Sequence, residues 1–308
     1  MNKNLGTSYI SFTEDQYTKM LNCFGEGFTR LLPIKINNYV TKWELQDLSL
    51  IEYYSVNCLF TCISKKYGDC VLKIFGCEYK CYIDEINVLK AVYKNSHYVK
   101  VYECDESNGA LLLERIKPGF VLSDEPSLNM RLSVFINAWE NTHTVPDNPT
   151  FFKTYLKAAE QVSTASWKCL ELSKLRQAAL KMSTACKGLY EKYPKSLLLH
   201  GDLHGDNLLK NPTGGYTMID PHGRIGPPIC DLGRYIANEY GNSGIDAKSE
   251  VVEHVLKTLS ISLNFPLIDV ARAFFVDITL MTCWDAEDGP AEIEGVLFAE
   301  NLLSQLAY

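Results

Sequence analysis

The residues with the clearest chemical potential lie between Lys195 and Asp231. An apolar run leads into the loop His-Gly-Asp-Leu-His-Gly-Asp-Asn, in which Asp202 and Asn207 stand five residues apart. A second short apolar run then ends at Asp220. This order predicts a strand, a polar loop, a second strand and an acid at the end of that strand.

The loop has the spacing His-x-Asp-x-x-x-x-Asn of the protein-kinase catalytic loop. In that loop the Asp accepts the proton of the substrate hydroxyl, and the Asn holds a magnesium ion. Asp202 and Asn207 fill these positions, and Asp220 is suitably placed as the second metal ligand. A single Asp is usually a turn residue or a helix cap, but three coincident positions favour the catalytic interpretation.

Two departures from the protein-kinase pattern are informative. Gly201 follows the loop histidine where protein kinases have Arg, and Asp-Pro-His replaces Asp-Phe-Gly at Asp220. Here the sequence resembles the aminoglycoside phosphotransferase family of small-molecule kinases. The closest resemblance is to its streptomycin and hydroxyurea kinase branch, whose pattern Ile-Asp-Pro-x-Gly-x-x-Gly-x-Pro-x-x-Asp this chain matches from Ile219 to Asp231. The resemblance implies ATP or GTP as phosphate donor, Mg²⁺ as cofactor, and a structural role for Asp231 as a brace of the catalytic loop.

The pattern of apolar residues predicts an α+β protein, and the resemblance implies a bilobal protein-kinase-like fold. We expect a nucleotide-binding N-terminal lobe with a small mixed β-sheet over residues 1–113, a hinge over 114–119, and a mainly helical catalytic and substrate-binding lobe over 120–308. Strands are predicted at 43–54, 57–64, 69–75, 99–104 and 110–117, with helices at 128–143, 151–165, 167–193, 250–263, 266–284 and 291–306.

Lys73 lies inside a predicted strand between two apolar residues. Such a Lys is most often an outward, solvated residue. By resemblance to kinases it is instead the strand lysine that contacts the nucleotide phosphates, and it then needs a carboxylate from the following helix. Glu85 is preferred over Asp84, because the family pattern places a Glu four residues before a helix Leu, here Leu89.

Two further nucleotide contacts are expected. The loop between the first two strands should cover the phosphates, but it holds no glycine, so Ser55 or Asn57 must serve in place of closely approaching backbone amides. By resemblance, backbone groups from Glu114 to Ile116 hydrogen-bond the adenine.

Acidic residues near the C-terminal helices are candidates for substrate binding. An acid-rich segment from Cys283 to Pro290 is predicted to be a turn, and such turns are usually solvated loops. In the family that the sequence resembles, acids of the C-terminal helices commonly hold cationic substrates. The candidates are Glu239, Asp285, Glu287 and Asp288.

The composition limits the class of protein. The chain has 308 residues, 46% hydrophobic and 22% charged, as in soluble globular proteins of two domains or lobes. Its net charge of −7 gives no basic footprint for nucleic acid, and no run of about 18 apolar residues predicts a membrane span. Without a secretory signal, the eleven scattered cysteines are expected to be reduced thiols of a cytoplasmic protein, and a zinc site is not expected.

The sequence therefore predicts a kinase that transfers the γ-phosphate of ATP or GTP to a hydroxyl of a small molecule. The resemblance favours an aminoglycoside-type antibiotic such as streptomycin. A metabolic kinase for an amino alcohol, sugar or nucleoside stays open, because such kinases share the loop. The glycine-free loop favours a nucleotide-binding pseudokinase as another alternative, whereas the complete set of catalytic residues argues against it. The oligomeric state stays open.

Overall fold

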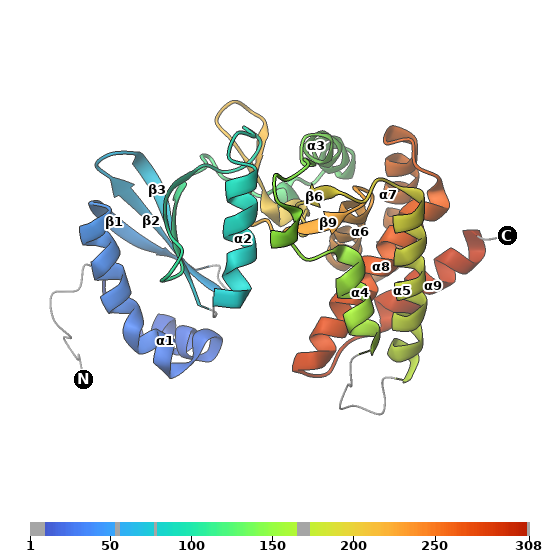
Figure 1. Cartoon of the computed structure of the whole chain (residues 1–308), viewed down its shortest axis with the longest axis horizontal. Coiled ribbons are helices and arrows are strands. Elements are labelled where there is room, and N and C mark those ends of the chain that lie inside the picture. Colours follow the sequence, from blue (N-terminus) through green and yellow to red (C-terminus); the bar gives the residue numbers. More distant parts are fainter. Residues whose placement is uncertain (1–9, 53–55, 77–78, 165–172, 307–308) are drawn as a thin grey trace.

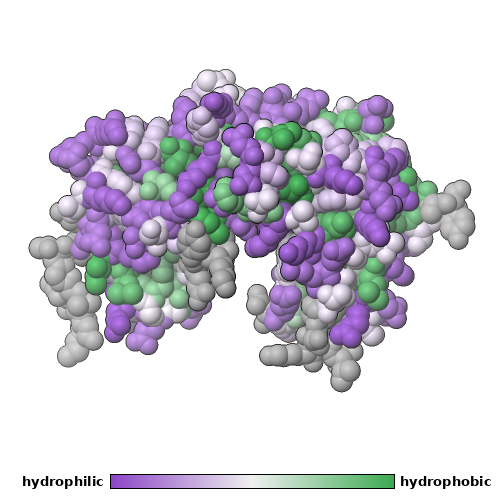
Figure 2. All heavy atoms as spheres, viewed as in Figure 1, coloured by the Kyte–Doolittle hydropathy of each residue, from purple (hydrophilic) through white to green (hydrophobic). Residues whose placement is uncertain are grey.

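The computed structural model describes the chain except residues 1–9, 53–55, 77–78, 165–172 and 307–308. Figure 1 shows two lobes, one built around a β-sheet and the other mainly of helices. Figure 2 shows that this face of the molecule is hollowed between them. The predicted α+β fold with two lobes is confirmed.

The N-terminal lobe holds one five-stranded sheet and two helices in the described part of the chain. The sheet order is β1-β2-β3-β5-β4, and every neighbouring pair is antiparallel, so the expectation of a mixed sheet was wrong. Short turns explain the pairs β2–β3 and β4–β5, because strands joined by short turns run in opposite directions. The elements are α1 (Glu14–Lys42), β1 (Leu45–Ile51), β2 (Asn57–Ser64), β3 (Gly68–Phe75), α2 (Tyr79–Ala91), β4 (Val101–Asp105) and β5 (Ala110–Glu114).

The two faces of this sheet are covered by different helices. Leu72 and Ile74 of β3 belong to the buried cluster that packs against α1, whereas Phe75 belongs to the cluster that packs against α2. Since side chains alternate along a strand, Lys73 faces the α2 side. It is buried there, with 4% of its surface exposed, so the default expectation of an outward strand lysine does not hold.

The segment 115–121 connects the two lobes, and it overlaps the hinge predicted at 114–119. Two short two-stranded antiparallel sheets, β6–β9 and β7–β8, carry the loop at 200–207 among the helices. The elements are η1 (Leu122–Asp124), α3 (Leu128–Glu140), η2 (Pro149–Phe151), α4 (Tyr155–Thr164), α5 (Ser173–Lys192), β6 (Leu197–Leu199), η4 (Gly205–Asn207), β7 (Leu208–Lys210), β8 (Tyr216–Met218), β9 (Arg224–Gly226), α6 (Cys230–Asn242), η5 (Ile245–Ala247), α7 (Lys248–Ser262), α8 (Leu267–Asp288) and α9 (Glu294–Leu306).

Helix α8 changes the interpretation of the acidic segment. The helix continues to Asp288, so the acids at 285–288 form its last turn, and the predicted turn there was wrong. Gly289 and Pro290 end the helix, as expected of residues that cannot easily continue it. Within the described residues, none of the helices combines the length and apolar character that a membrane span requires.

Candidate active site

The loop at 200–207 is anchored by His200, which is buried at the end of β6. Its Nε2 lies 3.0 Å from the carbonyl oxygen of Ile219, and its Nδ1 accepts a hydrogen bond from the Asp202 amide at 3.3 Å. Burial lowers the pKa of this histidine to about 4, so the ring is neutral and donates from Nε2. This histidine therefore ties the loop to the strand end that precedes Asp220.

Asp202 lies in this loop beside one arginine and two histidines. Its Oδ1 is 3.2 Å from Nε of Arg234, and its Oδ2 is 3.6 Å from His204 and 3.7 Å from His222. Burial acts to raise the pKa of Asp202, but the hydrogen bond from His204 and the charge of Arg234 outweigh it and lower the pKa. The carboxylate is therefore ionised, and it suits orienting a hydroxyl more than strong proton abstraction.

Asn207 connects Asp202 to the predicted metal site. Its side-chain nitrogen donates to the backbone oxygen of Asp202 at 2.9 Å and to Oδ2 at 3.2 Å, which turns its amide oxygen away from that carboxylate. The backbone oxygen of Asn207 accepts from the Ile219 amide at 3.0 Å, so Asp220 follows directly beside it. An amide oxygen and a carboxylate fit the oxygen ligands that Mg²⁺ prefers.

Lys73, Glu85 and Asp220 come together from β3, α2 and the segment after β8. The Lys73 ammonium lies 2.8 and 2.7 Å from the two Glu85 oxygens and also pairs with Asp220. Burial acts to lower the pKa of Lys73, but Asp220 and Glu85 outweigh it and raise the pKa. A permanent positive charge therefore stands beside the carboxylate predicted to bind metal.

We expect Lys73→Ala to lower the rate of phosphate transfer by about 10²-fold or more, because it removes a fixed charge that would stabilise transferred phosphate. Lys65→Ala, in the exposed turn before β3, is the control and should leave the rate unchanged. Initial rates with Mg·ATP, alongside thermal unfolding, check this. Full activity of Lys73→Ala would contradict the catalytic role, and Lys73 would then be only a structural partner of Glu85.

Helix α6 lies along the loop and contacts it at three places. Asp231, Arg234 and Asn238 recur at helical spacing on one face, and they contact residues 200–201, 202 and 206 in turn. The Asp231 carboxylate accepts from the backbone amides of His200 at 3.0 Å and Gly201 at 2.9 Å. This is the geometry of the predicted brace.

We expect Asp231→Ala to destabilise the fold by about 3–5 kcal/mol, because it leaves two buried backbone amides and His143 without their acceptor. Asp246→Ala, at an exposed position after the same helix, should change the free energy of unfolding by about 0.5 kcal/mol or less. Urea denaturation measures both. Equal stability of the two variants would contradict the role of Asp231 as a brace of the loop.

The remaining nucleotide contacts are only partly defined. Ser55 lies outside the described residues, and Asn57 begins β2 with its side-chain oxygen buried and without a hydrogen bond. The Glu114 amide donates to the Lys100 oxygen at 2.9 Å, so it is not free for an adenine. The backbone of Ile116 makes no hydrogen bond to other described residues, and it stays the predicted adenine contact.

The predicted substrate acids fall into two groups. Glu239 is 2% exposed and holds Arg131 through both oxygens, at 2.9 and 2.7 Å, so its charge is already neutralised. Asp285 and Glu287 are exposed on the last turn of α8 and form no ion pair with other described residues. The side chain of Asp288 lies outside the described residues.

Sequence reasoning missed the ionisable residues near Asp202, namely His204, His222 and Arg234, and the Asp277 that pairs with Arg234. One signal was present. Asp277 interrupts the apolar run Phe-Phe-Val-Asp-Ile-Thr-Leu-Met, and an acid in a buried helix requires a partner. The partner could not be named from the sequence, because Arg234 lies on another helix.

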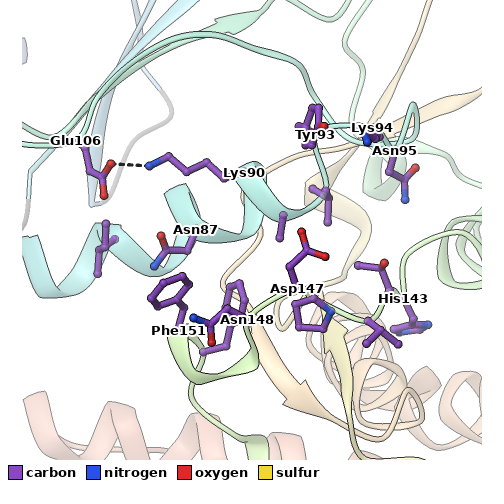
Figure 3. Close-up of a pocket in the computed structure, with 17 residues that line it drawn as sticks. Asn87, Lys90, Tyr93, Lys94, Asn95, Glu106, His143, Asp147, Asn148 and Phe151 are labelled. Carbon is purple, nitrogen blue, oxygen red and sulfur yellow. Dashed lines mark hydrogen bonds and ion pairs between the residues drawn. The ribbon is translucent and has the colours of Figure 1, made fainter.

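A cavity of about 880 Å³ lies elsewhere (Figure 3). It lies between α2 and the segment 143–152, and it is lined by Asn87 and Lys90 from the helix and by Asp147 and Phe151 from the segment. These helix residues project from a different side of α2 than Glu85. No predicted catalytic or binding residue lines this cavity, so it is separate from the candidate active site.

Comparison with solved structures places the fold. The chain is similar to the choline kinase LicA from Streptococcus pneumoniae, with 16% identity, a TM-score of 0.62, and coverage of 90% of this chain and 99% of that one. It is similar to an ethanolamine kinase of Plasmodium vivax, with 12% identity, a TM-score of 0.59, and coverage of 97% and 96%.

The aminoglycoside phosphotransferase APH(4)-Ia is similar to the same degree, with 13% identity, a TM-score of 0.59, and coverage of 88% of this chain and 97% of that one. No family model matches the sequence, and no curated protein matches it either. At these identities the likeness shows the fold alone. The chain therefore has the kinase-like fold that choline kinases, ethanolamine kinases and an aminoglycoside phosphotransferase share.

Proposed function

We propose that the chain is a small-molecule kinase that transfers the γ-phosphate of ATP or GTP to a hydroxyl group. The observation that carries this proposal is the convergence of Lys73, Glu85 and Asp220 beside the loop that holds Asp202 and Asn207. Solved structures with the same fold include LicA in complex with AMP, and a ternary complex of APH(4)-Ia with AMP-PNP and hygromycin B.

Each residue has a role that follows from its position. Asp202, fixed and ionised, orients the acceptor hydroxyl and accepts its proton as the phosphorus–oxygen bond forms. Lys73, held by Glu85, neutralises charge on the nucleotide phosphates. Asn207 and Asp220 would hold Mg²⁺, which supplies further neutralisation of phosphate charge.

The acceptor that we propose is a cationic, polyhydroxylated compound of the streptomycin type. The match from Ile219 to Asp231 and the net charge of −7 support it, and so do the carboxylates of Asp285 and Glu287, which form no ion pair within the described part of the chain. An ammonium or guanidinium group could pair with these carboxylates. An amino alcohol such as choline or ethanolamine is the second candidate, because kinases of both have this fold.

The test is nucleotide turnover across streptomycin, other aminoglycosides, hydroxyurea, choline, ethanolamine, simple sugars and nucleosides, with ATP and GTP each tried. Turnover with streptomycin, reduced in an Asp285→Asn, Glu287→Gln double variant, is the expected result. Turnover confined to an amino alcohol, a sugar or a nucleoside would reject the antibiotic and keep the kinase.

A further inference from the structure

A buried chain of charges lies beneath the catalytic loop and joins α4, α6 and α8. The Asp277 carboxylate on α8 accepts a hydrogen bond from the Tyr155 hydroxyl through Oδ1, and its Oδ2 lies 3.2 Å from Nε of Arg234. The same Nε lies 3.2 Å from Oδ1 of Asp202. One guanidinium therefore stands between a buried carboxylate and the proposed proton acceptor.

The backbone brings these groups together through Gly233. A Cβ on this residue would stand 2.3 Å from the backbone oxygen of Ala273 and 2.8 Å from the Asp277 side chain. Only a residue without a side chain lets α6 approach α8 so closely, and the approach sets Arg234 against Asp277. The fold thus fixes this arginine by packing as well as by charge.

We propose that Arg234 is a positioning residue for Asp202, with Asp277 and Tyr155 as its support. The proposal rests on the proposed function, because it assigns the rest of the machinery around the same carboxylate.

The unused hydrogen-bonding capacity of the pair favours this role. Nε of Arg234 and Oδ2 of Asp277 are buried but share no well-aligned hydrogen bond with each other or with other described residues. A purely structural pair of Arg and a carboxylate would be expected to align, as Arg131 of α3 and Glu239 of α6 do. Nε of the guanidinium instead lies 3.2 Å from one oxygen of each of two carboxylates, Asp202 and Asp277, while Oδ2 of Asp202 accepts a hydrogen bond from Asn207.

Asp277 explains why the arginine holds its place. Its side chain is 2% exposed, and a buried carboxylate requires compensation by a cation and hydrogen bonds. Arg234 can therefore not swing to solvent without leaving Asp277 uncompensated. Asp202 is consequently held by a group that is itself immobile, as a near-attack geometry requires.

The experiment uses hydrolysis of Mg·ATP, with water as acceptor, so that it does not depend on the identity of the substrate. Arg234→Ala is expected to lower kcat by about 100-fold with the KM for ATP unchanged, since a small displacement of a catalytic group has an effect of this size. Arg234→Lys should retain part of kcat. Millimolar guanidinium chloride should restore part of kcat in Arg234→Ala and none in Asp202→Asn.

The matched control is Arg131→Ala, which breaks the pair between Arg131 of α3 and the buried Glu239 of α6. It should lose stability without the fall in kcat. Equal falls in kcat for Arg131→Ala and Arg234→Ala, or a fall that follows only the loss of folded protein, would overturn the proposal.

A second measurement separates this proposal from the proposed function. In a crystal structure of Arg234→Ala, the Asp202 carboxylate should turn away from its wild-type position, and an unchanged carboxylate would overturn the positioning role. If the wild-type chain transfers phosphate neither to water nor to any acceptor, the proposed function falls. The crystal structure still decides what Arg234 does.

Discussion

Replacing Asp202 by Asn is expected to lower the rate of phosphate transfer by about 10³-fold while nucleotide affinity stays unchanged. The variant keeps the shape of the side chain but removes the ionised oxygens that orient the hydroxyl and accept its proton, an effect typically of 10²–10⁴-fold. Among the described residues Asp202 forms its ion pairs with His204, His222 and Arg234 and not with Lys73 or Asp220, so nucleotide contacts are preserved. Single-turnover rates and calorimetric titration of ATP measure the two quantities.

Asp206→Asn is the matched control for this variant. It removes a carboxylate from the same loop, and Asp206 lies beside the same histidine, His204, at 3.4 Å. Its side chain is half exposed and accepts a hydrogen bond from Asn238 at 3.4 Å, so its loss should have a much smaller effect on the rate. Comparable losses in the two variants would assign the effect to the charge balance of the loop and remove the specific role of Asp202.

Asp220→Ala is expected to abolish the magnesium dependence of nucleotide binding. It should also slow phosphate transfer, because the activation free energy rises by several kcal/mol. The variant removes one of the two oxygen ligands of the proposed metal site, and Asn207 alone offers a single neutral oxygen. ATP is titrated into the variant and the wild type with and without magnesium. Asp84→Ala, next to Glu85 on α2 but paired with Lys153, is the control.

An unchanged magnesium dependence in Asp220→Ala would contradict the metal assignment. Lys73 would then be the main partner of Asp220, and the pair would be structural. The two outcomes differ in how the affinity for ATP responds to magnesium, because only a residue that binds the metal makes this affinity depend on magnesium.

The catalytic loop could be predicted because its information is local. His200, Asp202, Asn207 and Asp220 lie within 21 residues, beside short strands whose apolar runs are visible in the sequence. The hairpin turns were equally predictable, since Gly68 and Gly109 adopt positive φ values of 77° and 65° that favour glycine.

The environment of that loop depends on residues far apart in the chain. Glu239 has an ordinary sequence context, and only the fold shows that Arg131, 108 residues earlier, already holds it. The side of the sheet that Lys73 faces depends on which helix covers each face, and alternation alone cannot decide this. Arg234 and Asp277 meet because two helices approach at a glycine, and packing of this kind has no local signature.

The acidic end of α8 shows a different limit. Asp285 and Glu287 were predicted in a turn because acids and Gly-Pro commonly mark one. The helix instead extends to its last possible residues before Gly289 and Pro290, because its apolar face continues to pack through Cys283. Packing of the apolar face outweighed the local preference of these residues for a turn. Asp285 and Glu287 therefore lie at the C-terminal end of a helix.

The most direct test of the account is whether a phosphate group moves from nucleotide to a hydroxyl. The wild-type chain is incubated with ATP or GTP, magnesium and each acceptor of the panel, and products are identified by mass spectrometry, with Asp202→Asn in parallel. The account predicts an acceptor that gains one phosphoryl group only with the wild type and magnesium. Nucleotide that binds equally to both proteins, with no phosphorylated acceptor from either, would contradict it and make the chain a nucleotide-binding regulator.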